Sequence, residues 1–184
     1  MKKLPLFIFV LICTCLASCF KETTSNWDKY ADWRNANTAW LQEMSLKTNP
    51  DGTPYYKKVS HAWYQQAHVY MHYFNDTTLT RKNLSPLYTS TVDVKYIGHL
   101  YDGTPFDSSF LSTSPADSLL RTRVDKVIAG WTVALTDMHI GDSCEVLIPY
   151  EYAYGNTSNS VIKPYSVLQF AIKLVDIPGY EKEP

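Results

Sequence analysis

The strongest constraint on the fold of this chain is a set of stretches in which apolar residues recur at every second position. The pattern runs from Thr91 to Tyr96 and again from Leu168 to Leu174. A period of two indicates strands with one buried face. Strand-like stretches are therefore expected at Tyr88–Leu100, Leu120–Val127, Ser143–Pro149 and Val167–Ile177. One short helix is expected over Val127–Met138, so the sequence predicts an α+β domain in which a helix covers one face of an antiparallel sheet.

The N-terminus combines a positive start with a short apolar run. Lys2 and Lys3 precede an almost entirely apolar stretch, Leu4 to Leu16, which ends in Leu-Ala-Ser before Cys19. These features describe a secretory leader, and the run is too short to span a bilayer comfortably. The end of the run resembles the bacterial lipobox, although a buried structural cysteine is the alternative. We therefore expect a lipoprotein signal peptide at residues 1–18, a lipid on Cys19 and a tether over residues 19–25.

Loss of such a leader changes the charge and the cysteine content. The chain has 17 Lys and Arg against 18 Asp and Glu, and the leader removes two lysines and no acid, which leaves a charge of about −3. A charge near zero does not suggest a nucleic-acid partner. Cys13 and Cys15 would leave with the leader, so Cys144 would be the one remaining unmodified thiol and no intramolecular disulfide could form. Its strand-like surroundings predict a buried, inert thiol.

Residues 26–84 form an extension with a helix and strands. Ser25 with Asp28 three residues later indicates a helix start, and the turn signal at residues 49–52 would end the helix. Six residues would lie on one face of this helix: Tyr30, Trp33, Asn37, Trp40, Leu41 and Met44. This face would pack on the rest of the chain, pair two copies or bind a partner. Strands are expected at Tyr55–Val59 and Val69–Phe74, and the β-rich second run argues against a metal site at His68 and His72.

An ordered series of short motifs is the strongest functional signal. Each motif is weak alone, but their order and spacing are specific. The series runs Val92-Asp-Val-Lys-Tyr96-Ile-Gly-His-Leu-Tyr-Asp102-Gly103, Phe106-Asp107-Ser-Ser, Val127-Ile-Ala-Gly130-Trp131, Met138-His-Ile-Gly-Asp142, Ile148-Pro149, Tyr152-Ala-Tyr154-Gly155, Ile162-Lys163-Pro164 and Leu168-Gln-Phe170. Asp102-Gly103 is a hairpin turn signal. The series resembles the FKBP-type peptidyl-prolyl cis-trans isomerases, in a lipoprotein form similar to those of Bacteroidetes.

The resemblance implies an FKBP-like antiparallel sheet wrapped around one short helix, with the N-terminal helical extension outside it. The isomerase domain would span residues 85–178, and residues 179–184 would be a tail. The resemblance also assigns roles in an apolar pocket. Trp131 would form its floor, the N–H of Ile128 and the hydroxyl of Tyr154 would bind substrate oxygens, and Asp107 would orient the polar edge. Its walls would be Tyr96, Phe106, Leu120 and Phe170, with Val127 and Ile162 beside them.

These features predict an enzyme that twists an X-Pro amide and needs no metal or cofactor. It would assist the folding of exported proteins from a lipid anchor in the cell envelope, at the outer membrane. Proline-containing polypeptides would be its substrates and macrolides its inhibitors. Two departures from the family pattern, Leu120 at a wall position that is often aromatic and Lys163 in place of a proline, leave an alternative open. That alternative is a catalytically weak binding or chaperone module.

Overall fold

One antiparallel sheet organises the molecule. The computed structural model describes residues 25–64, 67–112 and 118–179 of the chain, so Cys19, the expected signal peptide and residues 180–184 lie outside the described residues. Within this part the strands follow the order β1-β2-β6-β7-β3-β4, and β5 pairs with the other end of β3. The strands are β1 (Lys57–Val59), β2 (Val69–Tyr73), β3 (Thr91–Leu100), β4 (Pro105–Ser108), β5 (Leu120–Arg123), β6 (Ser143–Ile148) and β7 (Leu168–Asp176).

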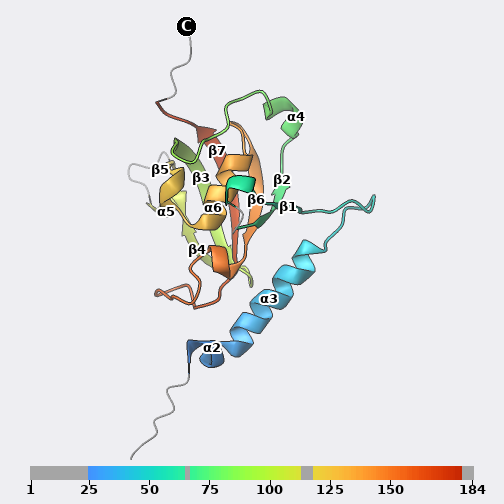
Figure 1. The fold of residues 1–184 in the computed structure, drawn as a ribbon, viewed down its shortest axis with the longest axis vertical. Helices are drawn as coiled ribbons and strands as arrows, with labels where there is room; N and C mark the ends of the chain where they lie inside the picture. The colour runs from blue at the N-terminus through green and yellow to red at the C-terminus, as the bar shows by residue number, and fades with distance from the viewer. Residues whose placement is uncertain (1–24, 65–66, 113–117, 180–184) are drawn as a thin grey trace, which may run out of the picture.

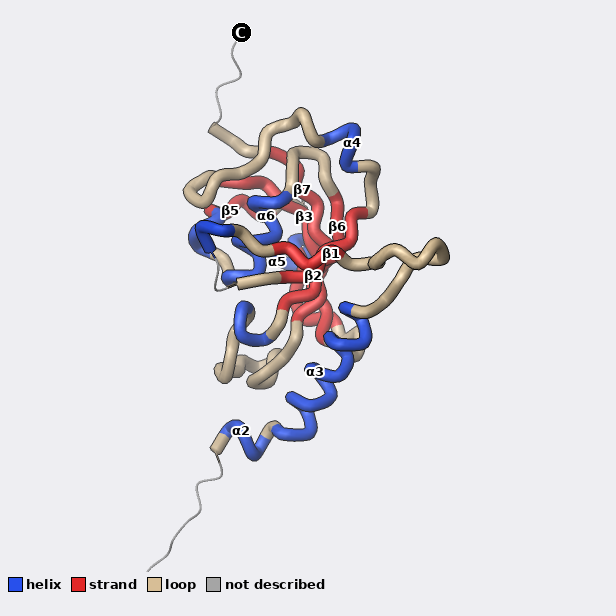
Figure 2. The backbone as a smooth tube through the Cα atoms, turned by 45° about the vertical axis from the view of Figure 1, so that its right-hand side comes forward, coloured by secondary structure: helices blue, strands red, loops and turns tan. Residues whose placement is uncertain are grey.

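Helix α6 (Ala129–Asp137) packs against one face of this sheet (Figures 1 and 2). Its residues from Gly130 to Leu135 are all buried, because the sheet covers one side and the segment around η1 (Ala62–Tyr64) covers another. Nε2 of His61 lies 3.1 Å from the carbonyl oxygen of Val133 on that second side. The predicted α+β fold, a short helix against an antiparallel sheet, is confirmed.

The alternating sequence pattern placed the central strands well. β3 pairs with β7 along most of its length, and Val92 and Val94 point into the core with no exposed surface. The predicted strand over Leu120–Val127 is wrong in its second half, since β5 ends at Arg123 and η2 (Val124–Lys126) follows. The chain turns there because Val124 is fully buried and its carbonyl oxygen accepts a hydrogen bond of 2.8 Å from Thr132 in α6.

The extension adds two strands to the sheet. β2 pairs with β6 in the antiparallel direction, and β1 pairs with the outer side of β2. Val69 and Met71 of β2 are buried and belong to the same hydrophobic core as the residues of α6. His72 stacks on the ring of Tyr55 and its Nδ1 lies 2.9 Å from the Tyr55 carbonyl oxygen. Strand β2, together with Val59 of β1, therefore contributes to the core that surrounds α6.

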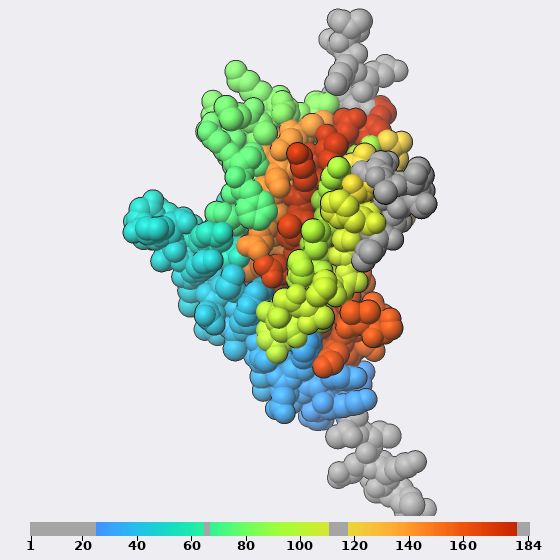
Figure 3. All heavy atoms as spheres, turned by 180° about the vertical axis from the view of Figure 1, so that it is seen from behind, coloured from blue at the N-terminus to red at the C-terminus, as the bar shows by residue number. Residues whose placement is uncertain are grey.

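The expected helix of the extension is divided in two. Ser25 caps α2 (Asn26–Lys29) by accepting from the N–H of Asp28, as predicted, but the backbone leaves the helical conformation at Tyr30 before α3 (Ala31–Ser45) begins. The two helices lie along one end of the sheet (Figure 1). Seen from behind, the blue atoms of this segment rest against the yellow-green β3–β4 turn and near the orange residues before β7 (Figure 3). Of the three alternatives for this helix, the structure shows packing on the rest of the chain.

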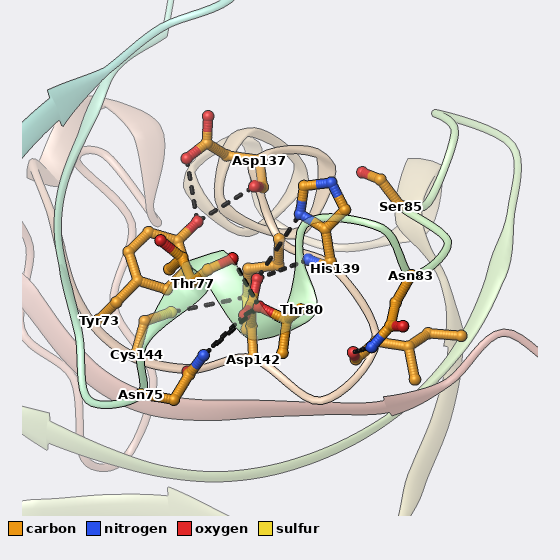
Figure 4. Close-up of polar contacts among 12 residues, drawn as sticks. Tyr73, Asn75, Thr77, Thr80, Asn83, Ser85, Asp137, His139, Asp142 and Cys144 are labelled. Atoms are coloured by element: carbon orange, nitrogen blue, oxygen red, sulfur yellow. Dashed lines mark hydrogen bonds and ion pairs between the residues drawn. The ribbon is translucent and has the colours of Figure 1, made fainter.

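A buried carboxylate joins the extension to the start of β6. Asp142 is 1 % exposed and accepts hydrogen bonds from the Thr80 hydroxyl (2.5 Å), the Asn75 amide (3.0 Å) and the backbone N–H of His139 (2.7 Å). Thr80 ends the short helix α4 (Thr77–Thr80), which no sequence pattern predicted. Figure 4 shows these donors converging on the carboxylate from three segments. Three donors stabilise a charge that would otherwise be costly to bury.

Cys144 lies beside this cluster as a buried thiol. It has no exposed surface, and its Sγ lies 3.6 Å from Sδ of Met138. Burial raises the pKa of this thiol, and the nearby Asp142 and Asp137 carboxylates raise it further. A thiol that stays protonated is a poor nucleophile. The expectation of a buried, inert cysteine is confirmed.

Candidate active site

A cavity of about 460 Å³ opens between the N-terminal end of α6 and the neighbouring strands. Segments far apart in the sequence supply its walls: β3, β4, β5, η2, α6, the turn after β6, and β7. The lining residues are Tyr96, Phe106, Asp107, Leu120, Lys126, Val127, Ile128, Trp131, Tyr154 and Phe170. The surface is mostly aromatic or aliphatic, with few polar groups at the edge, as is typical of a ligand-binding pocket.

Trp131 lies at the centre of the aromatic part. It is only 4 % exposed, and its ring meets those of Tyr96 and Phe170 edge to face at centroid distances of 5.0 and 5.2 Å. The Phe170 ring in turn meets that of Phe106 edge to face at 5.4 Å. These are the geometries that aromatic pairs prefer. Each ring is therefore held in place by its neighbours, which gives the pocket a preformed apolar surface.

Two glycines allow this close packing. A Cβ atom at Gly98 in β3 would lie 2.7 Å from the Phe106 ring and 2.8 Å from the Phe170 ring. A Cβ atom at Gly130 would lie within 2.9 Å of two side-chain carbons of Ile148 and still closer to a third. No sequence pattern indicated this role for Gly98. The structure shows that the strand must lack a side chain there for both phenylalanine rings to reach the pocket.

The polar edge of the pocket centres on the Asp107 carboxylate. Its Oδ2 accepts a hydrogen bond of 2.7 Å from the Tyr96 hydroxyl, and its Oδ1 accepts one of 2.8 Å from the backbone N–H of Ser108. Tyr154 lies across the pocket, 44 % exposed. Partial burial raises the pKa of Tyr154, and the negative charge of Asp107 raises it further. The Tyr154 hydroxyl is therefore a protonated donor at neutral pH.

The first turn of α6 adds backbone and indole donors. The carbonyl oxygen of Ile128 accepts from the N–H groups of Trp131 and Thr132, at 2.9 and 3.2 Å, so the helix begins directly after it. Among the described residues, the N–H of Ile128 donates no hydrogen bond, and the buried Nε1 of Trp131 has no partner either. A helix start leaves such N–H groups available to a bound acceptor.

The sequence predicted this set closely. The structure brings together Tyr96, Phe106, Asp107, Leu120, Val127, Ile128, Trp131, Tyr154 and Phe170. Ile162 does not line this cavity. It is buried and lines an adjoining hollow of about 290 Å³, whose wall also includes Phe106, Asp107 and Tyr154. Lys126, the one lysine of the lining, was not predicted from the sequence, although it directly precedes Val127. The roles assigned to these residues stay predictions.

The two departures from the family pattern lie in different places. Leu120 lines the main cavity, so the wall at this position is aliphatic. Lys163 lies away from the pocket, with its Nζ 4.3 Å from the centre of the Trp33 ring in α3. The substitution that concerns the pocket itself is therefore Leu120.

The described ranges 25–64, 67–112 and 118–179 hold neither a metal-binding cluster nor a membrane-spanning helix. No group of three or more His, Cys, Asp or Glu side chains is arranged there to hold a metal ion. Over the same ranges no helix has the length and apolar character that crossing a membrane requires.

Comparison with known proteins places this pocket in a family. Residues 84–175, half of the chain, match the FKBP-type peptidyl-prolyl cis-trans isomerase family. The Escherichia coli FKBP-type 22 kDa isomerase is 43% identical over 93 residues, which are 50% of this chain and 43% of that protein. The outer membrane protein MIP of Legionella longbeachae is 41% identical over 90 residues, 48% of this chain and 37% of that protein.

A solved structure is similar over a larger part of the chain. The crystal structure of a Pseudomonas syringae peptidyl-prolyl isomerase has a TM-score of 0.63 and 26% sequence identity, and covers 80% of this chain and 95% of that one. The matches to the two relatives above span less than half of each relative's length. With the motif series, the fold and the family match in agreement, this chain belongs to the FKBP-type peptidyl-prolyl cis-trans isomerase family.

Proposed function

We propose that this protein catalyses cis-trans isomerisation of X-Pro bonds in the cavity over Trp131. The observation that carries the proposal is the composition of this cavity. A preformed set of aromatic rings surrounds a space of about 460 Å³, and its edge holds one carboxylate and a protonated tyrosine hydroxyl. The E. coli and P. syringae relatives, both named as isomerases, support the same reaction.

The chemistry needs little more than such a pocket. Rotation about an X-Pro bond has a barrier of roughly 18–20 kcal/mol because twisting breaks amide resonance. The planar amide is more dipolar than the twisted one, so an apolar pocket disfavours the ground state relative to the transition state. A roughly 10⁴-fold acceleration corresponds to about 5–6 kcal/mol of this preference. No nucleophile has to be activated.

Each polar group has a place in this scheme. The proline ring would lie on Trp131, whose ring meets those of Tyr96 and Phe170 in the cavity lining. The N–H of Ile128 would donate to a substrate carbonyl, and the Tyr154 hydroxyl would donate to a second one. Asp107 would orient the polar edge through its bond to Tyr96 and set the field at the twisting amide.

The hydrogen bond assigned to Tyr154 gives a direct test. We expect Tyr154→Phe to lower kcat/KM for a proline tetrapeptide by about two- to tenfold, the value of one hydrogen bond of about 0.5–1.5 kcal/mol. Because the pKa of Tyr154 is raised, its hydroxyl stays protonated below the ordinary tyrosine pKa of about 10. The ratio of wild-type to variant activity should therefore be the same at about pH 7 and about pH 9.

The assay is protease-free isomerisation of the tetrapeptide by residues 19–184. A macrolide of the kind that FKBP-type proteins bind should compete with the peptide. Isomerisation by the folded wild-type chain at the uncatalysed rate would contradict the proposed enzyme. If the wild type and Tyr154→Phe are equally active, the role proposed for this hydroxyl is contradicted, while the pocket remains the proposed site.

A second function is favoured by one observation. Leu120 replaces an often aromatic wall with a smaller side chain, which reduces ring contact with a bound proline. The same pocket would then hold an apolar or proline-containing segment and turn it over slowly. Peptide binding without measurable isomerisation identifies this binding or chaperone function. If Leu120→Phe then restores turnover, the low isomerase activity of the wild type is due to Leu120.

We also propose that the protein acts on exported proteins from a lipid anchor at Cys19, which lies outside the described residues. The support is the leader sequence and the L. longbeachae relative, which is named an outer membrane protein. X-Pro isomerisation limits the folding of chains that emerge outside the cytoplasm, so an isomerase has a use there. An anchor would keep it close to newly exported substrates.

Replacing the expected lipidation site tests this localisation. Full-length Cys19→Ala, expressed in a bacterial host, is expected to leave the detergent-soluble membrane fraction, because a single Ala side chain cannot carry the acyl chains. Labelling with a radioactive fatty acid should disappear at the same time. Cys144→Ala is the matched control and should retain both the label and the membrane location. A wild-type chain without label would contradict the anchor.

A further inference from the structure

The loop between η3 (Tyr150–Tyr152) and β7 carries residues of the pocket. Tyr154 lies near its start and lines the main cavity, and Ile162 lines the adjoining hollow. The loop is closed by a hydrogen bond of 2.8 Å from the Tyr165 N–H to the Gly155 carbonyl oxygen. Its geometry at residue 165 therefore affects the position of Tyr154.

The base of this loop has an unusual conformation. Tyr165 has a φ of +63°, in the left-handed region that residues with a side chain seldom adopt. Such a conformation persists only where neighbouring groups hold it. The Tyr165 ring lies between the rings of Trp27 and Tyr150, at 5.4 Å from each and nearly perpendicular to both.

The helical extension holds the next two residues as well. Nε1 of Trp33 donates a hydrogen bond of 3.1 Å to the Ser166 hydroxyl. Asn37 has no exposed surface, and its Oδ1 accepts a hydrogen bond of 2.8 Å from the backbone N–H of Val167. The Nδ2 of Asn37 donates to the Trp33 carbonyl oxygen at 2.8 Å, which fixes the orientation of the amide. Three consecutive loop residues thus contact three different residues of the extension.

We infer that Asn37 and Trp33 are positioning residues for the substrate pocket. They act through the base of the loop, by fixing Ser166 and Val167 so that Tyr154 and Ile162 keep their places at the cavity. A buried side-chain amide that accepts from a strand-entry N–H is hard to replace, since its loss leaves the buried Val167 N–H without a partner. This inference rests on the proposed isomerase function of the pocket and extends it to the N-terminal helix.

The test compares two asparagines on one helix. Asn37→Ala removes the bond to Val167, and Asn35→Ala is the matched control because Asn35 lies on the exposed face of α3. We expect Asn37→Ala to lower kcat/KM for the tetrapeptide about three- to tenfold, with Asn35→Ala within twofold of wild type. Amide hydrogen exchange at Tyr165 and Val167 should rise at least tenfold in Asn37→Ala alone.

A double-mutant cycle separates positioning from general destabilisation. If Asn37 acts through the Tyr154 loop, its substitution should cost clearly less activity in a Tyr154→Phe background than in the wild type. Trp33→Phe is the second variant, because it keeps an aromatic ring at this position while removing the indole N–H that binds Ser166. Trp33→Phe is expected to lower kcat/KM as well, by a smaller factor. It therefore still tests the inference if Asn37→Ala folds poorly.

The outcomes separate this inference from the proposed function. Faster exchange at Val167 with unchanged kcat/KM in both variants would overturn the inference, since the helix would then support the fold alone. Additive effects of Asn37→Ala and Tyr154→Phe would overturn it too. An inactive wild type would contradict the proposed isomerase instead. The dissociation constant of the tetrapeptide, followed by tryptophan fluorescence, then decides the inference: it holds if Asn37→Ala raises that constant and Asn35→Ala leaves it unchanged.

Discussion

Asp107→Val is expected to lower kcat/KM for a proline tetrapeptide by about ten- to a hundredfold. This range corresponds to roughly 1.4–2.7 kcal/mol of transition-state stabilisation, the size expected for hydrogen bonds to a charged group. The valine removes the one carboxylate of the cavity lining and the acceptor that holds the Tyr96 hydroxyl at 2.7 Å. It is close to aspartate in size, so the rings around it should keep their packing.

Asp107→Asn is the control that separates charge from hydrogen bonding. Asparagine retains one oxygen acceptor for Tyr96 or Ser108 but carries no charge. If the field of the carboxylate favours the twisted amide, Asn and Val should be impaired to a similar degree. If its main role is to orient Tyr96, Asn should recover most of the activity. The free energy of unfolding, measured in urea, should change by less than about 1 kcal/mol for either variant. Equal activity of Asp107→Val and wild type would contradict the role proposed for this residue.

The sequence located most of the pocket because its residues lie in short motifs with fixed backbone roles. Val127, Ile128 and Trp131 belong to one helix start, and Phe106 and Asp107 are adjacent on one strand, so their relative positions follow from local structure. The central strands β3 and β7 followed from the period of two, although their ends and the second half of the strand expected at Leu120–Val127 did not. Ile162, which the resemblance placed beside the pocket walls, lines the adjoining hollow, and a loop residue has no periodicity from which its direction can be read.

The contacts between distant segments could not be predicted in this way. Asn37 was noted only as one member of a helical face, and nothing in its neighbourhood indicates that it binds Val167, 130 residues away. The pairing of β2 with β6 is equally non-local, since the alternation of a strand predicts a buried face and leaves its partner open. Gly130 stands in the motif series without any indication of its neighbour, and the structure identifies the Ile148 side chain as the group that approaches it.

Gly130→Ala is expected to lower the free energy of unfolding by about 2–3 kcal/mol. Alanine favours a helix over glycine by about 1 kcal/mol, so the substitution would stabilise an exposed helix. Here the new methyl group would lie within 2.9 Å of Cγ1 and Cδ1 of Ile148 and closer still to Cγ2. Ile148 is fully buried in β6 and has no free space to move into. Overpacking of this kind typically costs 1–3 kcal/mol or more, and urea unfolding measures the difference.

The identity of the clashing group can be tested by changing Ile148. In an Ile148→Ala background all three contacting carbons are gone, so the added cost of Gly130→Ala should vanish or become a gain. An Ile148→Val background keeps Cγ1 and Cγ2, so most of the cost should remain there. Ile→Ala alone costs about 2–5 kcal/mol, and the cycle therefore compares each double variant with its own single-variant background. An equal cost of Gly130→Ala in all three backgrounds would mean that the methyl group disturbs the helix start itself. In that case the loss should also appear as weaker peptide binding, because the same turn carries Ile128 and Trp131 into the cavity.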